Sequence, residues 1–275
     1  MKRNLFLVLL LGLILTVAAA CGSSDNNVEA EDNTANNAGN SNDDNGDKDV
    51  YTVATDNSYA PFEFINEETD ELEGFDVDLI KALADEAGIE IEIEQLEFDG
   101  IVAGLGSGKF DIGIAGMTIT EEREENIDFT QPYYEAGLIL AVTDEHDDIE
   151  SIDDVDDKVI ATRVGSTSED YLEENTEAER EAFPEITDAY QAVMQNKVDA
   201  VLYDLPNVQY YSNKETGGEL KTVGEKLTGE DYGIGFPKGS ELRDEIDDAL
   251  TTLKEDGTYG DIYEEWFGER PEDEE

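Results

Sequence analysis

Apolar and polar positions alternate after residue 50 in an order that predicts strands and helices in turn. Tyr51–Thr55 is a short, mostly apolar run typical of a buried strand. In residues 77–87 the apolar side chains recur at the spacing of one helix face, and Gly88 predicts the end of that helix. In residues 89–93 isoleucine alternates with glutamate, which predicts the next strand.

The same order recurs further along the chain. Lys158–Thr162 predicts a strand, and a helix is expected after Ser168. Residues 242–253 again place apolar side chains on one helix face. Alternation of this kind predicts an α/β architecture. The pattern runs from Val50 to Gly268, a length that suits two lobes of about 100 residues each.

Two segments of this pattern resemble each other. Lys109–Gly116 and Lys197–Asp204 each contain a lysine, an aspartate two residues later, and an apolar strand. Because ligands bind at the carboxyl ends of strands in open α/β sheets, residues 116–118 together with Tyr203 and Asp204 become candidates for two sides of one cleft. The alternative is that both segments serve the fold alone.

The first twenty residues predict an export signal. Lys2 and Arg3 precede an apolar run from Leu5 to Ala20 that is short for a membrane span and typical of a secretory signal. Cys21, the one cysteine, follows this run directly, so residues 1–20 resemble a bacterial lipoprotein signal whose next cysteine is lipidated. The resemblance implies attachment to the outer face of the cytoplasmic membrane. The alternative is an ordinary signal peptide followed by an unpaired thiol.

Residues 21–49 predict a disordered linker that begins at the lipidated cysteine. They are rich in asparagine, aspartate, glycine and serine, and such a segment buries too little apolar surface to offset its chain entropy. Ser41–Gly46 partly matches a calcium-binding loop. However, Ser41 replaces the first acid and Thr52 stands where the closing glutamate belongs, so we predict no calcium site.

Acidic side chains dominate the composition. The chain carries 71 acidic and 17 basic residues, for a formal net charge of -54, and it ends in a short acidic tail, residues 269–275. Such a charge repels nucleic acid and argues against it as a partner. Because the carboxylates are spread over the whole chain, they suit a surface in high salt, where the screening length falls to about 3 Å at 1 M.

Patterns of catalytic or metal-binding residues are scarce. The single histidine, His146, lies in an acidic run, and no cysteine and histidine cluster offers a transition-metal site. Gly104–Lys109 fails the spacing of a phosphate-binding loop, and no Gly-x-Ser-x-Gly elbow is present. Pairs of carboxylates are so common here that they neither support nor exclude a hydrolase. We expect no cofactor and no enzyme activity.

Arg123 is a cation in the first turn of a predicted helix. Thr120 is a good N-cap, and Glu121 and Glu122 suit the positive end of the helix dipole, whereas Arg123 opposes it. One explanation is a surface ion pair with Glu124, which contributes at most about 1 kcal/mol. The other is an anionic ligand at the free N–H groups of the helix start.

Five motifs occur in a fixed order along the globular part: Asp56–Phe62, Gly74–Leu79, Ala115–Arg123, Ile127–Tyr133 and Gly257–Phe267. Together they resemble the polar amino-acid solute-binding proteins of ABC importers, which have the type 2 periplasmic-binding-protein fold. Two further segments, Ala200–Asn207 and Tyr232–Gly239, are similar to the glutamine-binding members. The likeness covers the chain from Val50 to Gly268.

The resemblance implies two α/β lobes joined by two crossing strands, with a ligand cleft between them. Lobe 1 is expected to comprise residues 50–134 and 233–268, and lobe 2 residues 135–232. The chain is expected to cross near residues 134–138 and to return near residues 230–233. A bound ligand contacts both lobes and favours the closed state, and the permease recognises this closed state. We expect a monomer.

The resemblance also implies roles for individual residues in binding an amino acid. Arg123 is expected to hold the α-carboxylate, together with Thr118 and the backbone at Ser166 and Thr167. Asp204 is expected to accept from the α-ammonium. The rings of Tyr59 and Phe98 are expected to enclose the ligand stem. Gly116 and Tyr203 are expected to line the same cleft.

Specificity is expected to depend on Asp56 and Arg163. Asp56 can accept from the N–H₂ of a side-chain amide while Arg163 donates to its carbonyl, which favours glutamine. The sequence departs from the glutamine-binding pattern at Arg163, Tyr203 and Tyr59, where lysine, histidine and phenylalanine are usual. Glutamate, arginine, lysine and histidine therefore stay open as ligands.

The partners implied by the resemblance are a free amino acid, an ABC permease and its ATPase. The membrane is a further partner through the lipid on Cys21. Three other classes share this type of fold, namely a secreted dehydratase, the sensory part of a kinase, and an accessory domain of a cell-wall lyase. The last two normally need more chain than this sequence has, which leaves the dehydratase as the enzymatic alternative.

Overall fold

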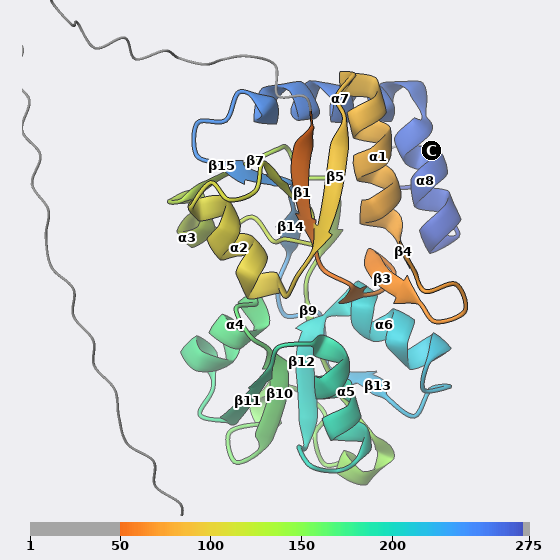
Figure 1. Cartoon of the computed structure of the whole chain (residues 1–275). Coiled ribbons are helices and arrows are strands. Elements are labelled where there is room, and N and C mark those ends of the chain that lie inside the picture. The colour runs from red at the N-terminus through yellow and green to blue at the C-terminus, as the bar shows by residue number, and fades with distance from the viewer. Residues whose placement is uncertain (1–49, 272–275) are drawn as a thin grey trace, which may run out of the picture. The chain divides into compact units, whose positions relative to one another are not determined.

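The computed structural model describes residues 50–271. The predicted signal segment, Cys21 and the linker lie outside the described residues, as do the last four residues of the acidic tail. Within the described part the chain forms two α/β lobes joined by a pair of crossing strands (Figure 1). The predicted α/β architecture is confirmed.

A five-stranded sheet forms the centre of lobe 1. Its strands, in the order β5-β1-β6-β15-β7, are β5 (Ile91–Gln95), β1 (Tyr51–Thr55), β6 (Ile112–Gly113), β15 (Gly235–Pro237) and β7 (Ile127–Phe129). The pairs of β1 with β5 and β6 are parallel, whereas β15 pairs antiparallel with β6 and β7. A segment near the C-terminus therefore completes the sheet that the N-terminal segment begins.

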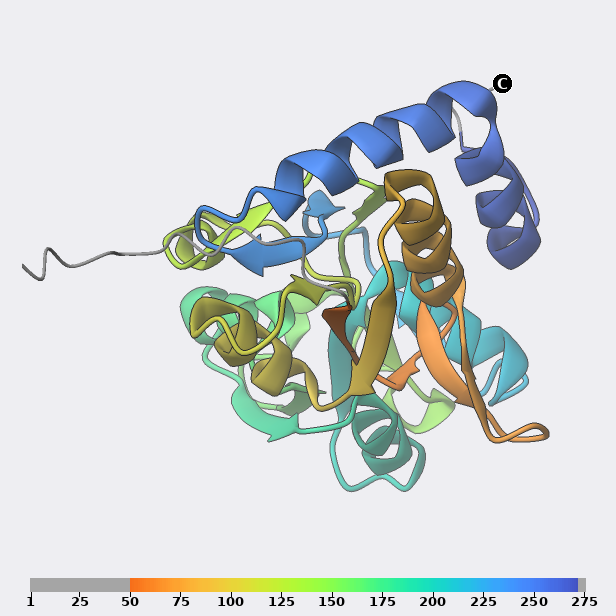
Figure 2. The same ribbon diagram turned by 45° about the horizontal axis from the view of Figure 1, so that its top comes forward.

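Five helices belong to lobe 1. They are α1 (Phe75–Ala87), α2 (Phe98–Gly106), α3 (Glu121–Glu124), α7 (Leu242–Asp256) and α8 (Thr258–Phe267). The periodicity of residues 77–87 correctly predicts α1, which ends at Gly88 in the left-handed conformation, with a φ of 71°. The buried face of α7 contains the leucine and isoleucine positions predicted for residues 242–253. Helices α1, α7 and α8 contact one another (Figure 2).

A small antiparallel sheet contacts helix α1 of lobe 1. It consists of β2 (Ser58–Tyr59), β3 (Glu63–Asn66) and β4 (Glu71–Glu73). The first of these strands contains Tyr59, whose side chain is 1% exposed. This sheet therefore fixes one of the predicted site residues.

Lobe 2 is built around a second five-stranded sheet. Its strands, in the order β11-β10-β12-β9-β13, are β11 (Glu179–Phe183), β10 (Val159–Arg163), β12 (Ala200–Asp204), β9 (Leu138–Val142) and β13 (Lys221–Val223). Its helices are α4 (Thr167–Asn175), α5 (Ile186–Met194) and α6 (Leu205–Lys214), with the short 3₁₀ helices η1 (Asp144–His146) and η2 (Ile152–Asp154).

Two antiparallel strands cross between the lobes. They are β8 (Tyr134–Ala136) and β14 (Glu230–Tyr232), which pair residue by residue from Glu230 opposite Ala136 to Tyr232 opposite Tyr134. Both lie where the sequence predicts the crossing. A bridge between Thr118 and Tyr232 ties a loop of lobe 1 to the second crossing strand.

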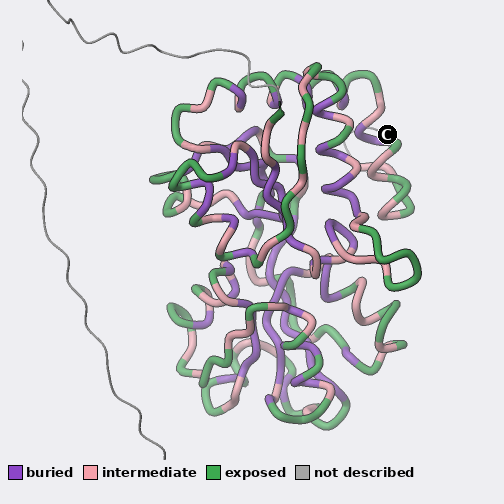
Figure 3. The backbone as a smooth tube through the Cα atoms, in the orientation of Figure 1, coloured by how far each residue is buried: buried purple, intermediate pink, exposed green. Residues whose placement is uncertain are grey.

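Buried residues run along the strands of both sheets and along the inner faces of the helices (Figure 3). The outer positions are exposed and mostly acidic. In β5, for example, the isoleucines are half-buried and the alternating glutamates are exposed. The alternation predicted for this strand is therefore correct in phase, although the strand occupies residues 91–95 rather than 89–93.

The start of helix α4 also differs slightly from the prediction. The helix begins at Thr167 rather than after Ser168. The reason is an N-cap, because the side chain of Ser166 accepts a hydrogen bond from the backbone N–H of Glu169.

The two similar segments, Lys109–Gly116 and Lys197–Asp204, have the same structural role in their lobes. Asp111 Oδ2 accepts from the backbone N–H of Thr52 at 2.7 Å, and Asp199 Oδ2 accepts from that of Val159 at 2.7 Å. Each aspartate thus satisfies a donor at the start of the neighbouring parallel strand. The lysine-x-aspartate pattern therefore contributes to the fold of both lobes.

Candidate functional site

The predicted site residues form one network of contacts at the boundary between the lobes. Asp56 follows β1 in lobe 1, and Arg163 ends β10 in lobe 2. Their side chains are 0% and 1% exposed and form an ion pair between Arg163 Nη2 and Asp56 Oδ2. A buried charge is costly unless it is paired. Because the partners belong to different lobes, this pair stabilises the contact between them.

Further bonds hold each member of this ion pair in place. Asp56 Oδ1 accepts from the backbone N–H of Ser58 at 3.0 Å and from its hydroxyl at 3.2 Å. Arg163 donates from Nε to Pro184 O and from Nη1 to the hydroxyl of Tyr203, both at 3.3 Å. The orientation of both charged groups is thus set by their own lobe.

The ring of Phe98 lies close to two guanidinium groups. The centre of its ring is 5.2 Å from Cζ of Arg123 and 5.1 Å from Cζ of Arg163. At these distances a cation is attracted to the face of an aromatic ring. Phe98 opens helix α2 and is 5% exposed. The ring therefore contacts one cation from each lobe.

Arg123 donates to backbone carbonyls rather than to Glu124. Its Nη1 donates to Thr118 O at 2.7 Å, and its Nη2 donates to Gly165 O on lobe 2 at 3.1 Å. Thr120 is the N-cap of α3, as the sequence predicts, and its hydroxyl accepts from the backbone N–H of Arg123. Because α3 spans only residues 121–124, its dipole is small and its repulsion of the guanidinium is weak.

Burial lowers the pKa of Arg123 below its usual value, and three nearby carboxylates oppose that shift. They are Asp170, Asp204 and Glu230. The guanidinium stays charged because even a lowered pKa leaves arginine protonated at neutral pH. The guanidinium of Arg123 thus lies near acidic side chains of lobe 2 and of the crossing strand.

Asp204 ends strand β12 and is 5% exposed. Its Oδ2 accepts from the hydroxyl of Tyr59 at 2.6 Å and from that of Tyr232 at 2.5 Å. Burial raises the pKa of Asp204 to about 7, and Glu230 adds to this rise, while the two tyrosines and Arg123 oppose it. The carboxyl therefore changes its charge near neutral pH.

Gly116 packs against the ring of Tyr59. Its φ is +53°, and a Cβ at this position would lie 2.2 Å from Tyr59 Cε1. Its N–H donates to Asp76 Oδ2 at 2.9 Å, which fixes the backbone here. Tyr203 meets the same ring edge-on, with 5.7 Å between ring centres. Tyr59 is thus enclosed from both lobes.

Ser166 and Thr167 open helix α4 on the lobe 2 side. The Ser166 hydroxyl donates to Arg163 O at 2.7 Å, which links the helix cap to the ion pair. Thr167 Oγ1 donates to Glu230 Oε2 at 2.9 Å, and Thr118 Oγ1 of lobe 1 donates to the same oxygen at 2.8 Å. These hydroxyls therefore meet on one carboxylate.

A cavity of about 460 Å³ lies beside these hydroxyls. It is lined by lobe 1, lobe 2 and the crossing strand: Thr118, Ile119, Thr120, Pro132, Thr167, Thr228, Gly229, Glu230 and Asp231. Its volume is in the range of small-molecule sites, and its lining includes four threonines and the carboxylates of Glu230 and Asp231. Two of the predicted contact residues, Thr118 and Thr167, thus line a space large enough for a small polar ligand.

Sequence reasoning missed two residues of the site. Glu230 is one acid among 71, so its identity alone carries no information. Tyr232 lies in a segment that resembles the glutamine-binding proteins, yet it was not predicted to contact Asp204. The position of both residues at the expected return of the chain to lobe 1 is the signal that could have identified them.

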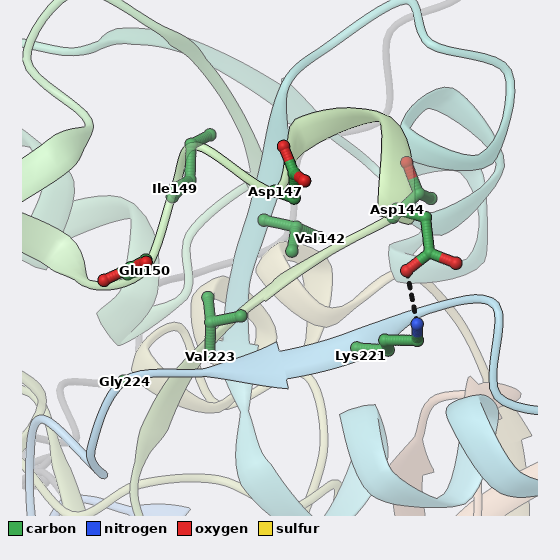
Figure 4. Close-up of a pocket in the computed structure, with 9 residues that line it drawn as sticks. Val142, Asp144, Asp147, Ile149, Glu150, Lys221, Val223 and Gly224 are labelled. Atoms are coloured by element: carbon green, nitrogen blue, oxygen red, sulfur yellow. Dashed lines mark hydrogen bonds and ion pairs between the residues drawn. The ribbon is translucent and has the colours of Figure 1, made fainter.

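A second cavity, of about 270 Å³, lies on lobe 2 and is lined by none of the predicted residues. Val142, Ile149 and Val223 provide apolar lining, and Asp144 forms an ion pair with Lys221 (Figure 4). Residues 50–271 contain no group of three histidine, cysteine, aspartate or glutamate side chains arranged to ligate a metal ion. No helix in that range has the length and apolarity that a bilayer span requires.

Comparison with known proteins matches residues 51–269 to the family of bacterial extracellular solute-binding proteins, family 3. The chain is 33% identical to the ABC transporter glutamine-binding protein GlnH of Bacillus subtilis, over 98% of this chain and 99% of that protein. It is 31% identical to the L-cystine-binding protein TcyA of the same organism, over 98% of both chains.

Among solved structures, an ancestral arginine-binding protein bound to glutamine superimposes with a TM-score of 0.77 and is 41% identical. The match covers 81% of this chain and 99% of that protein. The matched family consists of solute-binding proteins, so the dehydratase alternative is set aside. The chain belongs to the bacterial extracellular solute-binding proteins, family 3.

Proposed function

We propose that this protein binds a free polar amino acid between its lobes and delivers it to the permease and ATPase of an ABC importer. The observation that carries the proposal is the opposition of a cation on lobe 1, Arg123, and an acid on lobe 2, Asp204, each of which shifts the pKa of the other. A zwitterion needs both signs. Arg123 takes the α-carboxylate and Asp204 takes the α-ammonium.

The start of helix α4 supports the same assignment. The first N–H groups of a helix lack intrahelical acceptors and favour an anion. Ser166 and Thr167 stand at this position, and Arg123 already reaches across to Gly165 O beside them. The backbone here therefore completes the contacts of the carboxylate.

Glutamine is the ligand that the ion pair of Asp56 and Arg163 favours. Their charges oppose each other in a fully buried position. A neutral amide can donate to Asp56 and accept from Arg163, whereas a charged side chain is repelled by one of the two. The similarity to a glutamine-binding protein agrees with this choice.

A cationic amino acid such as arginine is the second candidate. Glu230 adds a third buried carboxylate to Asp56 and Asp204, against the two guanidinium groups of Arg123 and Arg163. An excess of negative charge favours a positively charged ligand. The similarity to an arginine-binding protein that was solved with glutamine fits either ligand.

Titration calorimetry of the purified protein tests the proposal. The panel comprises glutamine, glutamate, arginine, lysine, histidine and cystine, each measured at low and high salt. We expect heat with glutamine, and none with Arg123→Ala or Asp204→Ala at the same concentrations. Arg243→Ala removes an exposed arginine that pairs with Asp244, and it should bind as the parent does. A sugar and a short peptide complete the panel, and heat with these alone would show the proposal to be wrong.

The setting of the protein is also part of the proposal. A lipid on Cys21 would hold a monomeric binding domain at the outer face of the cytoplasmic membrane, and the acidic surface would suit high salt. Mass spectrometry of the exported protein tests the anchor. An unmodified thiol, or a retained segment of residues 1–20, would contradict it.

A further inference from the structure

Glu230 receives hydrogen bonds from both lobes at the point where the chain crosses between them. Its Oε2 accepts from Thr118 Oγ1 of lobe 1 at 2.8 Å and from Thr167 Oγ1 of lobe 2 at 2.9 Å. Its Oε1 accepts from Thr228 Oγ1 at 3.1 Å. All three bonds come from threonine hydroxyls and none comes from a cation. Neither the family match nor the sequence motifs assign a role to this carboxylate.

The position of Glu230 makes these bonds sensitive to the arrangement of the lobes. The residue belongs to β14, which is one of the two connections, and it is 8% exposed. Thr118 reaches it from the loop after β6, and Thr167 reaches it from the first residue of α4. If the lobes separate, the two threonines move apart and cannot both reach one oxygen atom. The pair of bonds therefore exists only while the lobes are in contact.

The bonds also fix the direction of the hydroxyl hydrogens. A threonine hydroxyl has one hydrogen and two lone pairs. Because Thr118 donates its hydrogen to Glu230, it can only accept from a ligand. An acceptor at this position suits an ammonium group and not a carboxylate. If Thr118 keeps this bond when a ligand is bound, the expected carboxylate contacts fall to Arg123 and to the backbone at Ser166 and Thr167, and not to the Thr118 side chain.

We propose that Glu230 is a positioning residue of the ligand site, which holds the lobes in contact through Thr118 and Thr167 and turns the lone pairs of Thr118 toward the ammonium group of the ligand. The role of Glu230 in orienting Thr118 toward a ligand rests on the proposed function. Its role in holding the lobes in contact does not depend on any ligand. Hydrogen bonds to a charged acceptor are stronger than bonds between neutral groups. Their loss should therefore be measurable in both lobe contact and ligand release.

The experiment compares two threonines that donate to the same carboxylate. Thr167→Val removes the bond from lobe 2. Thr228→Val removes a bond that comes from the same segment as Glu230, together with the bond that Thr228 Oγ1 accepts from the backbone N–H of Leu138 within lobe 2. Both changes keep the branched shape of the side chain and replace its hydroxyl by a methyl group. Glu230→Gln keeps the shape and removes the charge. Circular dichroism and the melting temperature identify any variant that fails to fold.

The first measurement is the distance between two dyes, one on each lobe of the full chain, with no amino acid added. Cys21 is replaced by alanine so that two introduced cysteines can be labelled. We expect Thr167→Val and Glu230→Gln to increase the fraction of molecules with separated lobes by about tenfold, and Thr228→Val to change it less than twofold, in line with loss of one bond to a charged group. Equal effects of Thr167→Val and Thr228→Val, or no effect of Thr167→Val, would overturn the proposal.

The second measurement is the dissociation rate of whichever amino acid gives heat in the calorimetric panel. We expect Thr167→Val and Glu230→Gln to release it about tenfold faster with little change in the association rate. If no amino acid binds, the proposed function is wrong, but the dye measurement still decides the role of Glu230 in lobe contact. Faster release without a change in lobe contact would overturn the role of Glu230 in holding the lobes.

Discussion

The hydroxyl of Tyr59 on lobe 1 donates to Asp204 Oδ2 on lobe 2 across 2.6 Å. The hydroxyl of Tyr232, on the crossing strand, donates to the same oxygen at 2.5 Å. Asp204, which is predicted to bind the ammonium group of the ligand, therefore already accepts hydrogen bonds from a residue of lobe 1 and from a residue of the crossing strand. Its state of ionisation and the contact of the lobes depend on each other.

Ligand binding should release protons near neutral pH. Burial raises the pKa of Asp204 to about 7, so the carboxyl is partly protonated there. An ammonium group favours the ionised form and lowers this pKa again. Affinity should therefore fall as the pH drops below 7, by up to tenfold per pH unit. Calorimetry at pH 7 in two buffers with different ionisation enthalpies measures the protons released.

The control for this prediction is Asp204→Asn, which cannot ionise. Its weaker binding should depend less on pH between about 6 and 8, because the carboxyl whose pKa lies near 7 is absent. Binding of equal strength at pH 6 and pH 8 in the parent protein would contradict the assignment.

The ion pair between Asp56 and Arg163 should govern lobe contact more than the stability of either lobe. Removing one partner of a buried pair typically costs about 3–5 kcal/mol, because a charge is left without a partner. In this protein the remaining Asp56 can regain water when the lobes separate. We therefore expect Arg163→Met to increase the radius of gyration in X-ray scattering while the melting temperature changes little.

A double variant provides the control for this ion pair. In Asp56→Asn with Arg163→Met neither charge remains, so lobe contact should partly return. The difference between the double variant and the sum of the single variants measures the coupling between the two residues. Purely additive effects would show that the pair does not link the lobes.

Local sequence patterns predicted several elements of the fold, because each of these elements is defined by neighbours along the chain. The apolar spacing of residues 77–87 and the cap at Thr120 are such local features. The pairing of Asp56 with Arg163 is different, because 107 positions separate the two residues. Only the resemblance to a known family brought them into one predicted site.

Neither local sequence patterns nor the resemblance to a known family predicted the role of Glu230. It is one of 71 acidic residues, so neither its charge nor its spacing distinguishes it. What distinguishes it is the meeting of two hydroxyls from Thr118 and Thr167, which are 112 and 63 positions away. Such a contact follows from the relative position of two lobes and is not encoded in a local pattern.

A pair of buried acids in lobe 1 should make folding stability depend on pH. Burial raises the pKa of Asp76 to about 6 and that of Glu63 well above its usual value, and Asp76 adds to the rise at Glu63. The folded protein thus holds protons that the unfolded chain releases. The contribution of Asp76 to the free energy of unfolding is fully present below about pH 4 and is lost as the pH rises through about 6. The contribution of Glu63 continues to be lost above that pH.

Glu63→Gln should remove much of this dependence, since an amide needs no proton to remain neutral. We expect the urea midpoint of the variant to exceed that of the parent at pH 8 and to approach it at pH 5. Glu71→Gln is the matched control, because Glu71 is exposed on the neighbouring strand β4. A variant that is as sensitive to pH as the parent would contradict the role of Glu63.

Gly116→Ala should weaken ligand binding far more than it destabilises the fold. A Cβ at this position would lie 2.2 Å from Tyr59 Cε1, so the ring must move and its bond to Asp204 must lengthen or break. The positive φ adds a cost of about 1 kcal/mol, as it does for any residue other than glycine. Gly108→Ala separates the two effects, because Gly108 has a φ of +70° but no heavy atom within 4 Å of the added Cβ. Gly116→Ala should therefore lose more stability in urea than Gly108→Ala, because the buried ring of Tyr59 must also move. Calorimetry should show reduced affinity for Gly116→Ala alone, and equal affinities of the two variants would mean that Tyr59 does not need its present position.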